Sequence, residues 1–382
     1  MGKLKINVDD LLPRLSQVVG VVNSKNAMPI LGDVLFVTRK EATENSGFSL
    51  TASDSETWLT VFSPCVEFDE DMMFCIAATD IYKALSNLKG KEVEIELDPS
   101  THVAKCTYGN GRFALPYEDA GDFPRPNMSA DDMIIKELHA DNLQRSIEKA
   151  GFAVASDELR PVMNGVHFDF THDGMVAVAT DGQKLAKYTD TTIRLSDDEP
   201  VSGFTLPKKP AHIMLGLLNG YNGDITLKFN DKCVRYTNND FTLTTRLIEG
   251  NYPQYNRVIP TDNPIDATVN KAEMITALKR VMPMGSMDSE LVRLTFAMGM
   301  LTISAEDLNF SKSASEEIGC EYSSPELAIG FNGSILMSIL QNIDGEQVKI
   351  SLKEPSRAGL FEPATPSETF CYVSLLMPIF IK

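Results

Sequence analysis

The sequence predicts an α+β protein of three similar domains, each with two helices packed on antiparallel sheet. A short motif in which an aromatic residue or methionine precedes a proline recurs at intervals close to one third of the chain. Its three copies are Gly121-Asp122-Phe123-Pro124, Gly250-Asn251-Tyr252-Pro253 and Leu376-Met377-Pro378. A period this long indicates whole domains, because solenoid repeats are shorter. The expected domains are residues 1–128, 129–255 and 256–382.

Each third opens with a helix that is predicted by apolar residues three and four positions apart. The three stripes are Leu11, Leu12, Leu15, Val18, Val19 and Val22; Leu143, Ile147, Ala150 and Val154, behind Asp141; and Met274, Ile275, Leu278, Val281 and Met282. Before the last stripe, Asn270 as N-cap and Glu273 three residues later have the spacing of a capping box. Each stripe is expected to face a hydrophobic core.

A second helix is expected midway through each third, at residues 80–89, 207–219 and 332–343. Alternating polar and apolar runs follow at residues 92–97, 224–229 and 347–352. This alternation is typical of antiparallel sheet with one buried face and one solvated face.

Composition is consistent with three ordinary cores, since 43% of the 382 residues are hydrophobic and 23% are charged. No signal peptide or membrane-length apolar run is present, so a soluble, cytoplasmic protein is expected. The six cysteines lie far apart with no CxxC pair, which favours reduced, buried thiols over disulfides or metal ligands.

Motifs of catalysis are missing from the sequence. There is no P-loop, no GxGxxG, no GxSxG and no HExxH. His167 and His172 flank a turn-like segment and are better explained by a hairpin than by a pair of metal ligands. The segment Thr180-Asp181-Gly182 begins like a calcium loop but lacks the alternating acids of one. We expect a non-catalytic protein without cofactor or metal; an enzyme of another type would need a polar cleft that no motif indicates.

The net charge of −18 argues against nucleic-acid binding, because phosphate contacts need Lys and Arg. The acids, however, concentrate in expected strands and loops, such as residues 67–71, 92–98 and 197–199, whereas the expected helices contain few. If the helices line one surface, an acidic protein can still present a neutral or basic face. The alternative is that each basic residue is ordinary solvated helix surface.

Four collinear motifs resemble the bacterial sliding clamp family, the β subunit of DNA polymerase III. They are NSKNAMPILG at residues 23–32, ATDGQKLA at 179–186, YPQYNRVIP at 252–260, and Met377-Pro378. The resemblance covers the full chain and implies three clamp-type domains that assemble as a head-to-tail dimeric ring. Such a ring encircles duplex DNA without sequence specificity and tethers the replicative polymerase for processive synthesis. A clamp-like structural ring not dedicated to replication is the alternative.

The resemblance implies that the helices line the hole and that basic residues on them face DNA. The candidates are Lys25, Lys83, Lys89, Arg145, Lys149, Arg160, Lys208, Lys209, Lys279 and Arg280. Arg145 and Lys149 can share one helix face at i, i+4 spacing.

Ring closure needs an interface, and edge strands supply one because pairing two edges removes both. The resemblance assigns to it Phe113 and Leu115 in the first domain and Val281, Met282 and Met284 in the third, and charge sign alone adds Lys105 and Arg112. Arg112 and Lys105 are expected to meet acids among Glu306, Asp307, Glu316 and Glu317. The alternative for Phe113 is a plain core residue.

The family binds short peptides of the replicative polymerase, the clamp loader, and repair and translesion polymerases in one pocket. The matching positions are Met163, Thr180, Gly182, Gln183, Lys184, Leu185, Pro253, Arg257, Val258, Asn332, Ile335, Ser356, Leu376, Met377, Pro378 and Ile379. The alternative is that the apolar members are core between domains. Gln183-Lys184 replaces the family's His-Arg, residues 355–368 are expected to form a long loop, and the chain ends with an apolar Ile-Phe-Ile segment. These departures predict a shifted peptide preference.

Overall fold

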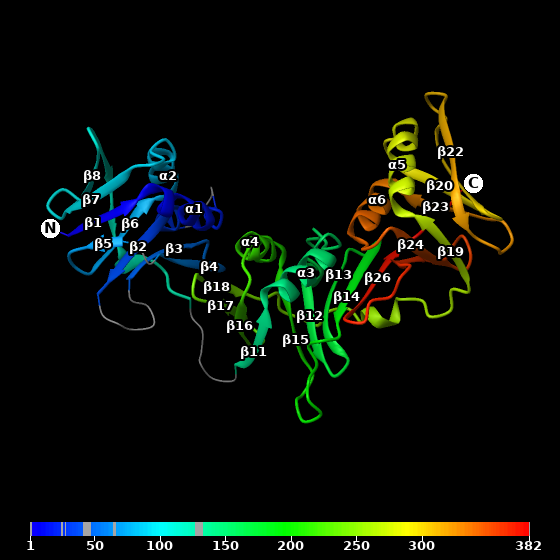
Figure 1. The fold of residues 1–382 in the computed structure, drawn as a ribbon, viewed down its shortest axis with the longest axis horizontal. Coiled ribbons are helices and arrows are strands. Elements are labelled where there is room, and N and C mark those ends of the chain that lie inside the picture. The colour runs from blue at the N-terminus through cyan, green and yellow to red at the C-terminus, as the bar shows by residue number, and fades with distance from the viewer. Residues whose placement is uncertain are drawn as a thin grey trace. The chain divides into compact units, whose positions relative to one another are not determined.

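The computed structural model describes residues 2–23, 26, 28–40, 47–63, 66–126 and 133–381. The chain divides into two compact units, residues 1–141 with 212–247 and residues 142–211 with 248–382 (Figure 1). This division passes through the expected middle domain because the strands of that domain belong to two different sheets.

The first unit contains two antiparallel sheets, in the orders β5-β1-β7-β8-β9 and β10-β6-β2-β3-β4-β18-β17-β16-β11. Its elements are β1 (Lys3–Asn7), α1 (Val8–Val19), η1 (Pro29–Gly32), β2 (Asp33–Arg39), β3 (Gly47–Ser53), β4 (Thr57–Ser63), β5 (Val66–Phe68), β6 (Met72–Ala77), α2 (Ala78–Ser86), β7 (Glu92–Asp98), β8 (Val103–Tyr108), β9 (Gly111–Pro116), β10 (Glu118–Asp119), η2 (Ala120–Asp122), β11 (Ile134–His139), β16 (Asp224–Phe229), β17 (Cys233–Thr237) and β18 (Phe241–Arg246).

The second unit contains one long antiparallel sheet, in the order β15-β12-β13-β14-β26-β25-β24-β19-β22-β21-β20-β23. Its elements are η3 (Pro161–Met163), β12 (Gly165–Thr171), β13 (Gly174–Thr180), β14 (Lys184–Asp190), β15 (Ser202–Pro207), η4 (Tyr255–Arg257), β19 (Ile265–Asn270), α5 (Lys271–Val281), η5 (Met282–Met284), β20 (Leu291–Ala297), β21 (Met300–Asp307), β22 (Lys312–Glu321), β23 (Leu327–Asn332), α6 (Gly333–Asn342), β24 (Gln347–Leu352), β25 (Gly359–Pro363) and β26 (Phe370–Leu376). Helices α3 (Ala140–Gly151) and α4 (Lys208–Leu218) each cross from one unit to the other.

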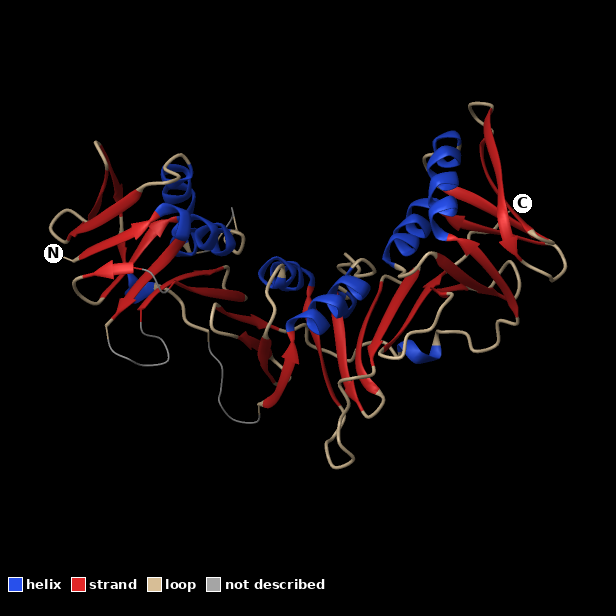
Figure 2. Ribbon diagram, viewed as in Figure 1, coloured by secondary structure: helices blue, strands red, loops and turns tan. Residues whose placement is uncertain are grey.

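All six expected helices are present, with ends that differ by a few residues from the predictions. In the first unit α1 packs against α2, β3 and β4, and in the second α5 packs against α6, β21 and β22 (Figure 2). The predicted cap of α5 is confirmed, because the Asn270 side chain accepts a hydrogen bond of 3.0 Å from the Glu273 N–H. The N-terminus of α3 differs: the helix begins at Ala140, one residue before the expected Asp141.

The alternating strands are confirmed, and two of them, β16 and β24, coincide with the predicted runs. The expectation of a long loop at residues 355–368 was wrong, because β25 lies inside it and pairs with β24 and β26. The sequence Gly-Leu-Phe-Glu-Pro of β25 has only a short apolar run between a glycine and a proline, which explains why alternation did not reveal it.

The central residues of each helical stripe are buried as expected, whereas Leu12, Val19, Val22, Ile275 and Met282 are half-buried. Leu11, Leu15 and Val18 of α1 are 0% exposed, as are Met274 and Leu278 of α5. Burying a side chain of this size contributes about 2 kcal/mol. Among the described residues, every helix is too short or too polar to cross a lipid bilayer.

Four of the cysteines are buried free thiols, Cys75, Cys106, Cys233 and Cys320, and burial raises the pKa of Cys75 and Cys106 to about 12. Cys371 is an exposed free thiol, so the expectation of burial was wrong for it. The sixth, Cys65, lies outside the described residues.

Candidate functional site

The candidate peptide site begins at the turn that joins β13 to β14. One oxygen of the Asp181 carboxylate accepts hydrogen bonds from the backbone N–H groups of Gln183 and Lys184, both at 2.9 Å. The other oxygen lies 2.5 Å from the Lys184 ammonium. Burial alone would raise the pKa of Asp181, but Lys184 and these backbone donors hold that pKa below its ordinary value. Gly182 has a φ of +90°, a conformation that favours glycine, so this segment forms a tight turn.

The end of the chain is fixed next to this turn. The Met377 N–H donates a hydrogen bond of 2.8 Å to the Gln183 carbonyl, and the Ile379 N–H donates one of 2.7 Å to the Gly330 carbonyl of β23. A Cβ at Gly330 would lie 2.6 Å from the Ile379 carbonyl oxygen, so glycine allows this close approach. The last residues are therefore held against both β14 and β23.

Apolar side chains remain exposed beside a buried cluster. Leu185, Tyr255 and Leu375 pack together in the core of the second unit. Val258, three residues after Tyr255, is 59% exposed, and Met377, two residues after Leu375, is 45% exposed. Both exposed side chains therefore closely follow, in sequence, residues of this buried cluster.

The structure separates the predicted site residues by burial. Met163, Thr180, Leu185 and Leu376 are at most 9% exposed, so they lie beneath the surface of the chain. The exposed members are Gly182, Gln183, Pro253, Arg257, Val258, Ser356 and Met377, and the half-buried ones are Lys184, Asn332, Ile335, Pro378 and Ile379. The side-chain Oδ1 of Asn332 caps α6 by accepting a hydrogen bond of 2.9 Å from the Ile335 N–H, which gives Asn332 a structural role.

A polar cluster that sequence reasoning missed holds the 252–258 segment on β12. The Tyr255 hydroxyl donates a hydrogen bond of 2.6 Å to Asp169, whose other oxygen lies 3.1 Å from Nε2 of His167. The His167 ring stacks on Tyr252 at 4.4 Å between centroids. Burial alone would raise the pKa of Asp169, but the His167 contact holds it below its ordinary value. His167 and Asp169 alternate with Phe168 and Phe170 along β12, a spacing that places both polar residues on one face.

That cluster is structural, and the hairpin expected around His172 is confirmed by the pairing of Thr171 with Gly174. Within the described ranges, His, Cys, Asp and Glu side chains form no group of three or more that could hold a metal ion.

The candidate DNA-facing residues fall into three groups. Lys83, Lys89 and Lys279 are exposed on or just after helices and make no ion pair with any residue that the structure describes. Arg160 and Arg280 are exposed but paired, Arg160 with Asp157 at 2.9 Å and Arg280 with Glu316. Lys208 is exposed with its ammonium 3.4 Å from the Ser156 hydroxyl, Lys209 is half-buried, and Lys25 lies outside the described residues.

Lys149 was expected to face DNA, but it is only 8% exposed and is therefore buried. Its ammonium lies 2.7 Å from Asp344 Oδ1 and 2.6 Å from the Asn342 carbonyl. Arg145 lies over the Phe370 ring at 5.0 Å, and Lys149 lies over Tyr372 at 5.6 Å. The two cations do share a helix face as predicted, but that face packs on β26.

The expected subunit interface is also revised in part. Phe113 and Leu115 are half-buried on β9, at the edge of the five-stranded sheet, so the plain-core alternative does not describe them. Val281 is 1% exposed and belongs to the core beneath α5. Met284 is 41% exposed, whereas Met282 is half-buried beside Gly333.

The charge pairs expected at this interface differ as well. Lys105 binds Asp98 of its own chain at 2.9 Å, and Glu316 is occupied by Arg280 of its own chain. Arg112 is exposed on β9 and remains available to a partner's carboxylates.

Three domain families match consecutive parts of the chain. They are the N-terminal domain of the DNA polymerase III beta subunit at residues 2–129, its central domain at residues 137–254 and its C-terminal domain at residues 256–378. Each match falls almost wholly within one third of the repeat that the sequence analysis described.

Relatives match along the whole length. A beta sliding clamp of Pseudomonas putida is 29% identical over 363 residues, which cover 94% of this chain and 95% of the relative. A solved sliding clamp of Bartonella birtlesii bound to griselimycin has a TM-score of 0.90 at 25% identity, covering 100% of both chains. A solved C. crescentus clamp, with polyethylene glycol at a candidate β-motif tethering region, has a TM-score of 0.89 at 27% identity, covering 100% of this chain and 99% of the other. The chain therefore belongs to the DNA polymerase III beta subunit family, the beta sliding clamps.

Proposed function

We propose that two copies of this chain join head to tail in a ring that encircles duplex DNA and tethers the replicative polymerase. The ring adds no chemistry of its own. It supplies a topological link, because a duplex that passes through a closed ring need not be gripped tightly to be retained.

The repeated strand pairing between domains carries this proposal. The last strand of the middle domain, β18, pairs with the fourth strand of the first domain, β4. The last strand of the third domain, β26, pairs with the fourth strand of the middle domain, β14. Continuation of this pattern pairs β9, the last strand of the first domain's five-stranded sheet, with β22 of another copy; the two-residue β10 that follows pairs with β6. Among the described strands β9 pairs only with β8, and residues 312–317 of β22 pair only with β21.

The internal pairs also predict the register of this contact. Leu243 of β18 lies opposite Leu59 of β4. Phe113 holds the position of Leu243 in the last strand of the first domain, and Ala314 holds the position of Leu59 in the fourth strand of the third domain. We therefore expect Phe113 opposite Ala314, with an unbroken ladder of backbone hydrogen bonds between the copies.

Weak contacts suffice for DNA inside a ring. Lys83, Lys89 and Lys279 are suited to phosphate contacts, which position a duplex without reading its sequence. The net charge of −18 repels DNA from other surfaces and makes the basic helix faces its favoured location.

The surface of Gln183, Val258 and Met377 is the proposed docking site for linear peptides of the polymerase, the clamp loader and repair or translesion polymerases. The exposed Val258 and Met377 side chains suit the Leu and Phe anchors of such peptides, and the adaptable Met377 accommodates different sequences.

Retention on nicked circular DNA after loading by the cognate clamp loader tests the proposal. The protein should stay on circles through gel filtration and leave when a restriction enzyme makes them linear. Persistence on the cut DNA would show direct affinity instead of encirclement and would overturn the proposal.

A further inference from the structure

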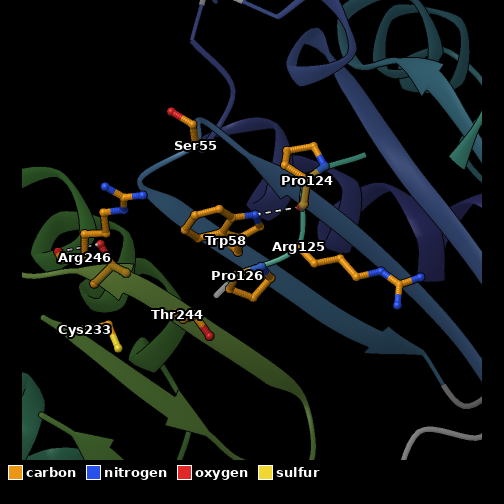
Figure 3. A pocket seen from close by; sticks show the side chains of 9 residues that line it. Ser55, Trp58, Pro124, Arg125, Pro126, Cys233, Thr244 and Arg246 are labelled. Atoms are coloured by element: carbon orange, nitrogen blue, oxygen red, sulfur yellow. Dashed lines mark hydrogen bonds between the residues drawn. The ribbon is translucent and has the colours of Figure 1, made fainter. Parts of the chain in front are cut away.

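A cavity that the proposed function does not use lies at the first boundary of the repeat, where the first domain meets the middle domain. It has a volume of about 260 Å³ and lies in the first unit, between β4, β18 and the 124–126 segment. The Trp58 ring is at its centre, with its Nε1–H donating a hydrogen bond of 2.9 Å to the Pro124 carbonyl (Figure 3). Pro126, Cys233 and Thr244 complete the wall.

This cavity occupies the position that the candidate peptide site occupies one domain further along. The turn before β4 repeats the backbone-to-side-chain hydrogen bonds of the turn before β14. Asp54 accepts from the N–H groups of Glu56 and Thr57 at 3.1 and 2.8 Å, as Asp181 does from Gln183 and Lys184. Ser55 has a φ of +75° where Gly182 has +90°.

Strand register gives the same equivalence. Trp58 of β4 lies opposite Thr244 of β18, as Leu185 of β14 lies opposite Leu375 of β26. The Arg246 N–H donates a hydrogen bond of 2.9 Å to the Glu56 carbonyl, as the Met377 N–H does at 2.8 Å to the Gln183 carbonyl. Arg246 thus stands where the peptide site has Met377.

Side-chain volume explains why the first boundary is hollow. At the second boundary, Leu375 packs with Leu185 in a buried cluster, and Leu376 follows it, opposite Lys184. At the first, the equivalent residues are Thr244 and Thr245, which are smaller and already hydrogen-bonded, to Arg235 and Thr57. The cavity therefore presents the Trp58 face and the prolines, with no buried threonine hydroxyl that a ligand must satisfy. It is too small for a typical drug-sized ligand but suits one apolar side chain.

The rim of the cavity is positively charged. Arg246 lies beside the Trp58 ring, and Arg125 extends away from it on the opposite side (Figure 3). Arg125 is exposed and makes no ion pair with any residue that the structure describes. The Arg246 side chain is 65% exposed and its one described ion pair, with the exposed Glu56, spans 3.5 Å. A loose pair of this kind is readily exchanged for a ligand carboxylate.

We propose that this cavity is a second peptide site, for an extended acidic segment of a partner protein that seats one Leu or Phe side chain against Trp58. Carboxylates next to that anchor pair with Arg246 and Arg125. The site is separate from the surface of Gln183, Val258 and Met377, and it does not depend on ring closure.

The test uses the only tryptophan of the chain, Trp58, as the reporter. The full-length protein is titrated with three blocked pentapeptides that share a Leu-Phe pair and carry two Glu, two Gln or two Lys residues. The acidic peptide should produce a saturable change in fluorescence excited at wavelengths where only tryptophan absorbs. Its affinity should exceed that of the neutral peptide about threefold to tenfold, and the basic peptide should bind most weakly.

Surface variants locate the binding. Arg125→Gln with Arg246→Gln should remove the preference for the acidic peptide, whereas Glu56→Gln, which frees Arg246, should strengthen acidic binding about twofold to threefold. Met377→Glu should leave the Trp58 signal unchanged, because it alters only the other boundary. Absence of a fluorescence change with all three peptides would overturn the proposal. So would a change that Met377→Glu abolishes and the double arginine variant retains. Failure of ring formation would alter none of these readings.

Discussion

Lys149 joins α3 to the end of α6 through a single ammonium group. Its partners, the Asn342 carbonyl and the Asp344 carboxylate, lie 193 and 195 residues further along the chain. Asp344 Oδ2 has no hydrogen-bond partner among the described residues, so Lys149 supplies the charge that balances this carboxylate. Loss of one member of such a pair costs more than the pair contributes, because the other charge is left behind.

Lys149→Gln should lower the free energy of unfolding by about 2 kcal/mol while leaving DNA retention intact. The measurement is chemical denaturation followed by circular dichroism. Lys89→Gln is the matched control, because Lys89 is exposed and unpaired with any described carboxylate. The control should retain full stability. Equal stability of the two variants would contradict the structural role of Lys149.

Asp33 gives the protein a pH-dependent stability. Burial, reinforced by Glu118 and Asp80, raises the pKa of Asp33 to about 6 from 3.8. Between these values the folded protein binds more protons than the unfolded chain, so the free energy of unfolding falls as the pH rises through this window.

Asp33→Asn should therefore stabilise the protein by about 1 kcal/mol at pH 7.5, with a gain that shrinks to nothing near pH 4. Thermal unfolding at a series of pH values measures this. The exposed Asp231→Asn serves as the control for the loss of one negative charge. A gain that is the same at both pH values would show that Asp33 is not the titrating group.

Those properties of single residues that depend on near neighbours in the sequence could be predicted. The Asn270 cap follows from a residue three positions away and is confirmed. The burial of Lys149 depends on residues far along the chain, so no local pattern could reveal it. Asp169 and Tyr255 were missed for the same reason, since 86 positions separate them.

Among elements, regular periodicity decided what could be predicted. The helices and the alternating strands were found because one face of each is buried, whereas β25 was hidden by its short apolar run. The motifs located the β13–β14 turn and the chain end, but which of their residues are exposed follows from tertiary packing. Leu185 and Met377 belong to the same predicted site, yet the first is 1% exposed and the second 45%.

The segment after β26 offers an element-level prediction about peptide docking. Met377→Glu places a charge where an apolar anchor is expected to bind, so affinity should fall about tenfold for a labelled peptide from the cognate polymerase with Leu and Phe anchors. Fluorescence anisotropy measures the affinity. Met298→Glu, at an 83% exposed methionine next to the β20–β21 turn, is the matched control. Equal losses in the two variants would contradict docking at Met377.

The whole molecule follows one rule of assembly within the chain: the strand that ends the sheet of a domain pairs with the fourth strand of the preceding domain. Sequence indicated the threefold repeat, and the structure adds the two internal pairings that define the rule. The proposed third pairing, of β9 with β22 of another copy, would close the ring.

A cysteine cross-link across that third pairing, formed after loading on nicked circles, tests the central claim most directly. The protein carries Phe113→Cys and Ala314→Cys in a background with Cys65→Ser and Cys371→Ser. Phe113→Cys with Ser313→Cys is the matched control, because neighbouring side chains on a strand point to opposite faces.

Phe113→Asp with Leu115→Asp should give monomers in sedimentation velocity.

The 113–314 pair should cross-link efficiently and the control pair should not. The cross-linked protein should stay on uncut circles in denaturing detergent until a restriction enzyme releases it. Failure of this pair to cross-link, or escape of cross-linked protein from intact circles in detergent, would contradict ring closure by this pairing.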